Sequence, residues 1–176
     1  MPNKIVLGNL YNLDLTAKPL AFISFVAVWI ILSAIAFVVL RFSFLDSLIG
    51  GFVCTVLHYL SELIHHFGHA GAARNTGYPM RGVKFVHVLA YSQYPRDEPE
   101  LSGKIHIRRA LGGPAISFVV SVIAFLILLI AQNYGGLFYW IALWFFLDNF
   151  FVFFLGAFLP LGFTDGSSIY KWWGKP

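Results

Sequence analysis

The sequence predicts an all-α polytopic membrane protein. Hydrophobic residues make up 59% of the chain and charged residues only 11%, and a soluble domain of 176 residues has too little interior to bury that much apolar surface. Four apolar stretches are each long enough to cross a bilayer, which takes about 20 residues per helix. We expect one membrane domain over residues 1–176, with spans at about 19–40, 47–73, 110–131 and 135–163.

The first span begins at Pro19, which suits the first position of a helix, and it is apolar on all sides. We expect it to remain as an anchor, because its apolar run is longer than that of a typical cleaved signal peptide and starts only after residue 18. The single cysteine, Cys54, has no partner for a disulfide.

A polar stretch separates spans two and three. Its first part carries the turn signal Gly77-Tyr78-Pro79, and residues 83–92 then alternate loosely between aromatic or β-branched and other residues. This pattern predicts a short β-hairpin at the membrane surface.

The basic residues predict the orientation of the chain. The net charge is +4, and every lysine and arginine except Arg41 lies in the N-terminal tail, in the loop between spans two and three or at the C-terminus. The positive-inside rule therefore places both termini and this loop in the cytoplasm. Such a basic rim fits contact with membrane lipid and not with nucleic acid.

Span two carries an unusual group of polar side chains: His58, Glu62, His65, His66 and His69. On a helix that turns about 100° per residue, they form one stripe about 100° wide. Ionisable groups inside a bilayer are costly, so each is a functional hypothesis by default. The stripe must face a protein interior or a water-filled cavity.

His65 and His69 have the i, i+4 spacing that lets two imidazoles bind one metal ion. Asp165 is the candidate for a third ligand, because Pro160, Gly162 and Gly166 loosen the end of span four and let its carboxylate turn inward. The histidine pair and Asp165 then lie at similar depth on the cytoplasmic side of the membrane, so we expect a zinc site. The alternative is that the histidines and the acid only pair with one another across helices.

Three segments together resemble the site-2 proteases, which are intramembrane zinc metalloproteases: His65-His66-Phe67-Gly68-His69, Leu111-Gly112-Gly113-Pro114 and the run from Leu159 to Gly166. The resemblance extends from about Gly50 to Trp173 and implies the same order of zinc helix, hairpin and following spans. This chain departs from the family at two positions. His66 replaces the glutamate after the first histidine, and Ala157 replaces the usual asparagine three residues before the proline.

The missing glutamate predicts impaired catalysis, because zinc-activated water still needs a group to take its proton, and losing a general base costs about 10² to 10⁴ in rate. Two residues are candidate replacements. His66 is itself a candidate base, since a neutral imidazole accepts a proton near pH 7. Glu62 lies one turn earlier on the same stripe.

Three classes of function follow. The first is a site-2-protease-like protein with impaired catalysis that keeps its metal and serves as a binding or assembly partner of another membrane protein or a transmembrane peptide. The second is an active intramembrane zinc metalloprotease with His66 or Glu62 as base. A di-iron oxidoreductase or a haem-binding subunit ranks third, because the six histidines are too few for the usual di-iron set.

Overall fold

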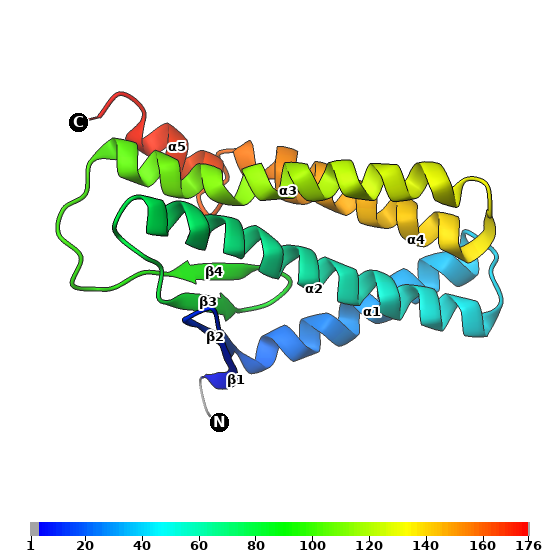
Figure 1. Ribbon diagram of the computed structural model, residues 1–176. Helices are drawn as coiled ribbons and strands as arrows, with labels where there is room; N and C mark the ends of the chain where they lie inside the picture. Colours follow the sequence, from blue (N-terminus) through cyan, green and yellow to red (C-terminus); the bar gives the residue numbers. More distant parts are fainter. Residues whose placement is uncertain (1–3, 176) are drawn as a thin grey trace.

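A computed structural model describes residues 4–175 and shows four long helices packed side by side (Figure 1). The helices are α1 (Pro19–Val38), α2 (Phe44–Asn75), α3 (Gly103–Ala131) and α4 (Gly136–Leu147). The last of them continues through a π-helical segment, η1 (Asp148–Leu155), and a short 3-10 turn, η2 (Gly156–Phe158). A short helix, α5 (Asp165–Trp172), follows near the C-terminus.

Four helical stretches in the described residues are long and apolar enough to cross a membrane: Pro19–Val38, Phe44–Asn75, Gly103–Ala131 and Gly136–Phe158. Each predicted span coincides with one of them. The third begins seven residues before the predicted position 110, because the helix continues through the basic turn that contains Lys104 and Arg108. The fourth ends at Phe158 instead of 163, since Pro160 and Gly162 follow.

Local signals explain where the first two helices start and how they pair. Pro19 occupies the start of α1, as its position in the sequence predicts. Ser43 caps α2 by accepting a hydrogen bond from the backbone N–H of Asp46 at 3.1 Å. The indole N–H of Trp29 donates to the carbonyl of Leu48 at 2.9 Å and ties α1 to α2.

A small sheet lies at one end of the helices, and its strands are β1 (Ile5–Leu10), β2 (Leu13–Ala17), β3 (Gly82–Phe85) and β4 (Ala90–Gln93). The predicted hairpin is β3–β4, which is antiparallel. The tail adds a second hairpin, and β2 pairs parallel to β3. The sequence did not reveal this hairpin because its turn, Tyr11-Asn12, takes two positive φ angles without the glycine that usually marks such a turn.

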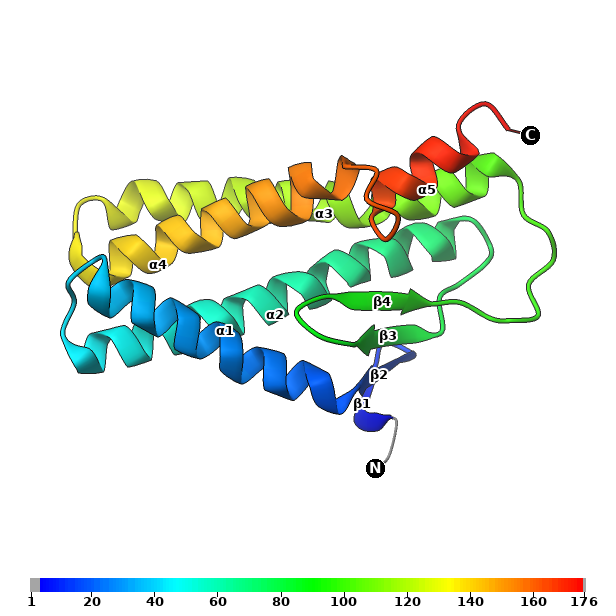
Figure 2. The ribbon, with the colours of Figure 1, turned by 180° about the vertical axis from the view of Figure 1, so that it is seen from behind.

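The sheet and α5 lie at the same end of the molecule, while the α1–α2 and α3–α4 connections lie at the other (Figures 1 and 2). The β3–β4 hairpin runs along α2. On another side of α2, the backbones of Gly68 and Gly112 approach so closely that a β-carbon on either would overlap the other's carbonyl oxygen. The polar face of α2 is therefore enclosed between α3, the hairpin and the end of span four.

Candidate metal centre

The predicted polar stripe of α2 is buried. His58, Glu62, His65, His66 and His69 are each less than one-tenth exposed. In an apolar span such groups need partners, because a buried polar side chain without a hydrogen bond is costly. Each of the five has at least one, and the partners come from α3, η1, α5 and the β3–β4 hairpin.

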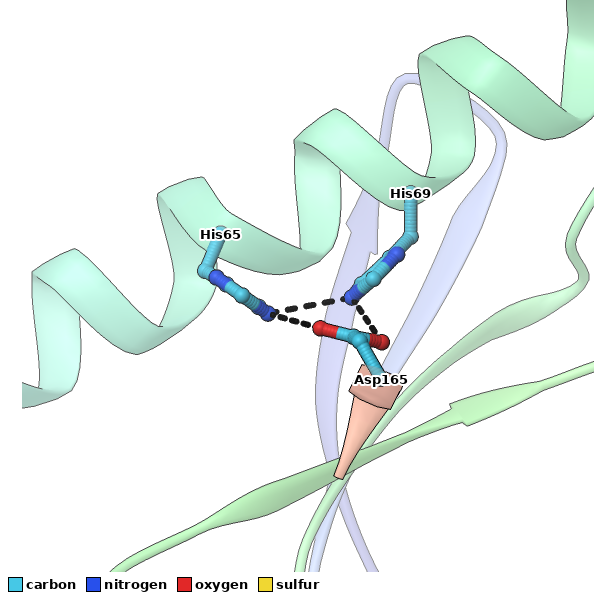
Figure 3. Close-up of side chains that lie close together, drawn as sticks. All are labelled: His65, His69 and Asp165. Carbon is cyan, nitrogen blue, oxygen red and sulfur yellow. Dashed lines mark hydrogen bonds and ion pairs between the residues drawn. The ribbon is translucent and has the colours of Figure 1, made fainter. Parts of the chain in front are cut away.

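His65, His69 and Asp165 converge on one point (Figure 3). The Nε2 atoms of the two histidines are 3.0 Å apart. Asp165 places Oδ2 at 3.2 Å from Nε2 of His65 and Oδ1 at 3.3 Å from Nε2 of His69. These three residues are the metal ligands that the sequence predicts, and their donor atoms lie within 4.8 Å of one another.

The separations of the donor atoms fit a tetrahedral ion. Ligands at about 2.0–2.1 Å from a zinc ion in tetrahedral geometry lie about 3.3 Å from one another. Nε2 of His65 lies 3.2 Å from Oδ2 of Asp165, and Nε2 of His69 lies 3.3 Å from its other oxygen, Oδ1, so each imidazole has a carboxylate oxygen near this value. The nitrogen–nitrogen separation of 3.0 Å is slightly shorter. Two imidazoles and one carboxylate also form a donor set that zinc uses when it keeps a position open for water or substrate. The residues present therefore fit the ion.

The far nitrogen of each imidazole is held by α3. Nδ1 of His69 lies 2.8 Å from the backbone carbonyl oxygen of Arg109 and 3.2 Å from the backbone nitrogen of Gly113, both on α3. With Nδ1 held by α3, Nε2 faces Asp165 and is the atom that would bind a metal, which requires it to be without a proton. Nδ1 of His65 lies 2.9 Å from the hydroxyl of Ser117. Sequence reasoning missed Arg109 and Ser117 as partners, because neither belongs to a recognisable motif.

Asp165 reaches the site from α5 and not from the end of span four, where the sequence placed it. The chain leaves the helix after Phe158, turns at Gly162 with φ 89°, and starts α5 at Asp165. Burial raises the pKa of this carboxyl, but hydrogen bonds with His65 and His69 outweigh that effect and bring the pKa down to about 2. The carboxylate is thus charged, as a zinc ligand must be.

Gly113 lies against Nε2 of His65 and Nε2 of His69, the two nitrogens that face Asp165. A β-carbon at this position would overlap Nε2 of His65 and Nε2 of His69. The sequence offered this residue only as part of the Leu111–Pro114 motif and gave no role for it. Its role follows from packing, since only a residue without a side chain leaves this space free.

His66 and Glu62, the candidate bases, lie beside the three candidate ligands and contact the hairpin. Nδ1 of His66 is 3.0 Å from the hydroxyl of Ser92, and its Nε2 is 3.4 Å from Oε1 of Glu62. Oε1 of Glu62 also accepts a hydrogen bond from the backbone N–H of Ala90. Both residues are therefore engaged with β4 and with each other.

The remaining histidines lie outside this group. His58 pairs with Asp148 of η1, and His106 stacks on the ring of Trp172 at 4.1 Å. His87 belongs to the hairpin turn, where its Nδ1 accepts from the N–H of Leu89. Glu98, in the loop before α3, forms a largely buried ion pair with Arg109 at 2.6 Å.

Two cavities meet at the site. One, of about 230 Å³, extends from the ligands between the hairpin and the end of span four, and its other walls are mostly apolar: Leu89, Val152, Phe153, Leu159, Leu161 and Phe163. The second, of about 280 Å³, shares His66, His69 and Asp165 with the first. It continues past Tyr94, Glu98, His106 and Arg109. The site thus has one mainly apolar approach and one polar approach.

Comparison with known proteins links this arrangement to a solved structure. No protein-family model matches the sequence, and no curated protein matches it either. Among solved structures, the site-2 protease from Methanocaldococcus jannaschii superposes with a TM-score of 0.63 and 19% sequence identity. The match covers 96% of this chain and 70% of that protein. The chain is therefore an integral membrane protein with the fold of a site-2 protease.

Proposed function

We propose that the chain is a site-2-protease-like membrane protein that binds one zinc ion through His65, His69 and Asp165 and hydrolyses peptide bonds weakly or not at all. The observation that carries the metal site is the convergence of two imidazole nitrogens and one carboxylate at tetrahedral separations. When bound, zinc would polarise a carbonyl oxygen and activate water. The chain's own residues would hold the ion and line the cavity around a bound peptide.

The surroundings of His66 support impaired catalysis. A general base needs a free lone pair within hydrogen-bond reach of the proton that it removes. Both nitrogens of His66 already have partners, Ser92 and Glu62, and Glu62 also accepts from the backbone of Ala90. We therefore assign His66 and Glu62 to holding the hairpin, and we propose that the apolar cavity receives a transmembrane peptide or a helix of another membrane protein.

The second candidate function is an active intramembrane zinc metalloprotease. One observation favours it, namely that His66 and Glu62 both line the cavity that contains the three ligands. If a bound peptide displaced the hairpin, either residue would be released to act as base. Hydrolysis of a membrane-helix substrate by the wild-type protein at a rate typical of a protease would decide for this function.

Metal analysis tests the zinc site. Protein purified in detergent is expected to contain about one zinc ion per chain. Asp165→Asn is expected to lose most of it, because a neutral amide replaces the charged ligand. Elemental analysis by mass spectrometry gives the stoichiometry. Stoichiometric iron or haem would favour the third functional class, and a zinc content unaffected by Asp165→Asn would exclude this carboxylate as a ligand.

We also propose that both termini face the cytoplasm. The basic residues gather in the tail, the loop before α3 and the C-terminal segment, and only Arg41 lies near the opposite end. A reporter fused after Lys175 or inserted near Pro99 is expected to read as cytoplasmic, and one after Gly135 as external. The reverse pattern would contradict the proposed orientation.

A further inference from the structure

A second polar cluster lies deeper in the bundle than the metal ligands, and the proposed function does not use it. His58 is on α2, seven residues before His65, which is about 10 Å along a helix. Its Nδ1 lies 3.1 and 3.2 Å from the two carboxylate oxygens of Asp148 on η1. Its Nε2 lies 3.0 Å from the backbone carbonyl oxygen of Val88 in the turn of the β3–β4 hairpin.

The chemistry of these partners fixes the role of the ring. A carboxylate and a carbonyl oxygen both accept hydrogen bonds and do not donate, so His58 donates through both nitrogens. Such a buried charged pair is a poor source of stability, because removing two charges from water costs about as much as their attraction returns. A role in specifying the arrangement of neighbouring elements fits this pair better.

The three elements that meet at His58 also form the walls of the metal cavity. The α2 helix supplies the metal-binding histidines, η1 supplies Phe153, and the hairpin supplies Leu89 and Ala90, which directly follow Val88. The ring of His58 packs on Phe153 at 5.2 Å between centroids. A single residue thus connects every wall of the cavity except the segment that carries Asp165.

Other side chains of α2 also form hydrogen bonds with the β3–β4 hairpin. The hydroxyl of Tyr59 donates to the carbonyl of His87 at 3.2 Å. Glu62 accepts from the N–H of Ala90, and His66 contacts Ser92. Positions 87, 88, 90 and 92 of the hairpin are therefore held by three successive turns of α2. His58 forms the innermost contact and, through Asp148, the only one of these that also reaches span four in the described structure.

We propose that His58 and Asp148 are positioning residues, in which Asp148 orients the imidazole and Nε2 of His58 clamps the hairpin turn and so fixes the wall of the metal cavity. Any effect of this contact on a peptide in the cavity rests on the proposed function. The contact between His58 and the hairpin turn, which we call the clamp, is independent of that function, because the position of the hairpin is measurable without metal, substrate or hydrolysis.

Two substitutions separate the two contacts of the ring. Asparagine places its amide nitrogen near the position of Nδ1, so His58→Asn keeps a donor to Asp148 and loses the bond to Val88. Glutamine reaches the position of Nε2, so His58→Gln keeps a donor to the Val88 carbonyl and loses Asp148. Both variants remove the same positive charge, and each is therefore the control for the other.

Hydrogen exchange of the full chain in detergent, read by mass spectrometry over residues 82–93, is the measurement. His58→Asn is expected to exchange about tenfold or more faster than the wild type in the hairpin, the ratio expected for one lost charge-assisted hydrogen bond. His58→Gln is expected to stay within about threefold of the wild type, since its remaining bond is neutral and weaker. Exchange in α3 is expected to change little in either variant.

Equal hairpin exchange in the two variants would overturn the proposal, and so would a rise that extends over the whole protein. If the uncompensated Asp148 carboxylate prevents folding, the same pair is compared in an Asp148→Asn background, which removes the buried charge. There too the asparagine variant must exchange faster than the glutamine variant. Loss of zinc binding with an intact difference between the variants would refute the proposed function and leave the clamp standing.

Discussion

Replacing Gly113 with alanine is expected to reduce zinc affinity by about 100-fold or more, beyond the range of about 10- to 100-fold typical of changes around a metal ligand. The added methyl group would overlap Nε2 of His65 and Nε2 of His69. Neither ring can simply swing aside, because the far nitrogen of each is held by α3, at Ser117 and at the carbonyl of Arg109. The rings would have to give up their convergence or their supporting hydrogen bonds. Zinc titration of the purified variant measures the effect.

Gly71→Ala is the matched control. Gly71 is also a helical glycine, on α2 two residues after His69, but a β-carbon there meets no atom within 4 Å. This variant is expected to bind zinc as the wild type does and to be slightly more stable, since alanine favours a helix over glycine by about 1 kcal/mol. Wild-type zinc affinity in Gly113→Ala would show that the ion does not lie between these two nitrogens.

The spans and the pair of candidate histidine ligands followed from sequence patterns alone. Membrane helices satisfy their own backbone groups, so an apolar run of sufficient length predicts a span without any knowledge of its neighbours. The i, i+4 spacing of His65 and His69 likewise depends only on the geometry of one helix. The structure has both features, and the whole polar stripe of α2 is buried.

What the sequence could not supply depends on contacts between distant segments. Asp165 was expected on span four, but it starts a separate helix after a turn at Gly162. The partners of His66 and Glu62 come from β4, and no local pattern specifies which strand residues a helix will meet. The first hairpin was missed because its turn, Tyr11-Asn12, lacks the usual glycine, and the parallel pairing of β2 with β3 joins segments that lie far apart in the chain.

The double variant His66→Glu with Glu62→Gln is expected to raise hydrolysis of a membrane-helix substrate by about 100-fold or more over the wild type. It puts a carboxylate at the position from which, by resemblance, a site-2 protease takes a proton from water. The three ligands His65, His69 and Asp165 stay unchanged. The expected gain equals the factor by which the rate falls when a general base is missing.

The second substitution is needed because of the hairpin contacts. Oε1 of Glu62 lies 3.4 Å from Nε2 of His66, so His66→Glu alone would set two carboxylates against each other in a buried place. The single variant is therefore expected to gain less than the double variant. Glutamine at position 62 removes the repulsion, while its amide oxygen still accepts the hydrogen bond from Ala90. Glu62→Gln alone is expected to leave the weak activity of the wild type in place.

A panel of single-span helices with helix-breaking residues serves as substrate, with cleavage followed by gel and mass spectrometry. The double variant carrying Asp165→Asn in addition is the control and is expected to be inactive, because it loses the metal but keeps the new carboxylate. Efficient cleavage by the wild type, with no gain from either variant, would instead establish an active protease that uses His66 or Glu62 as base. The comparison thus decides between the two proposed functions, because only an impaired site gains from a restored carboxylate.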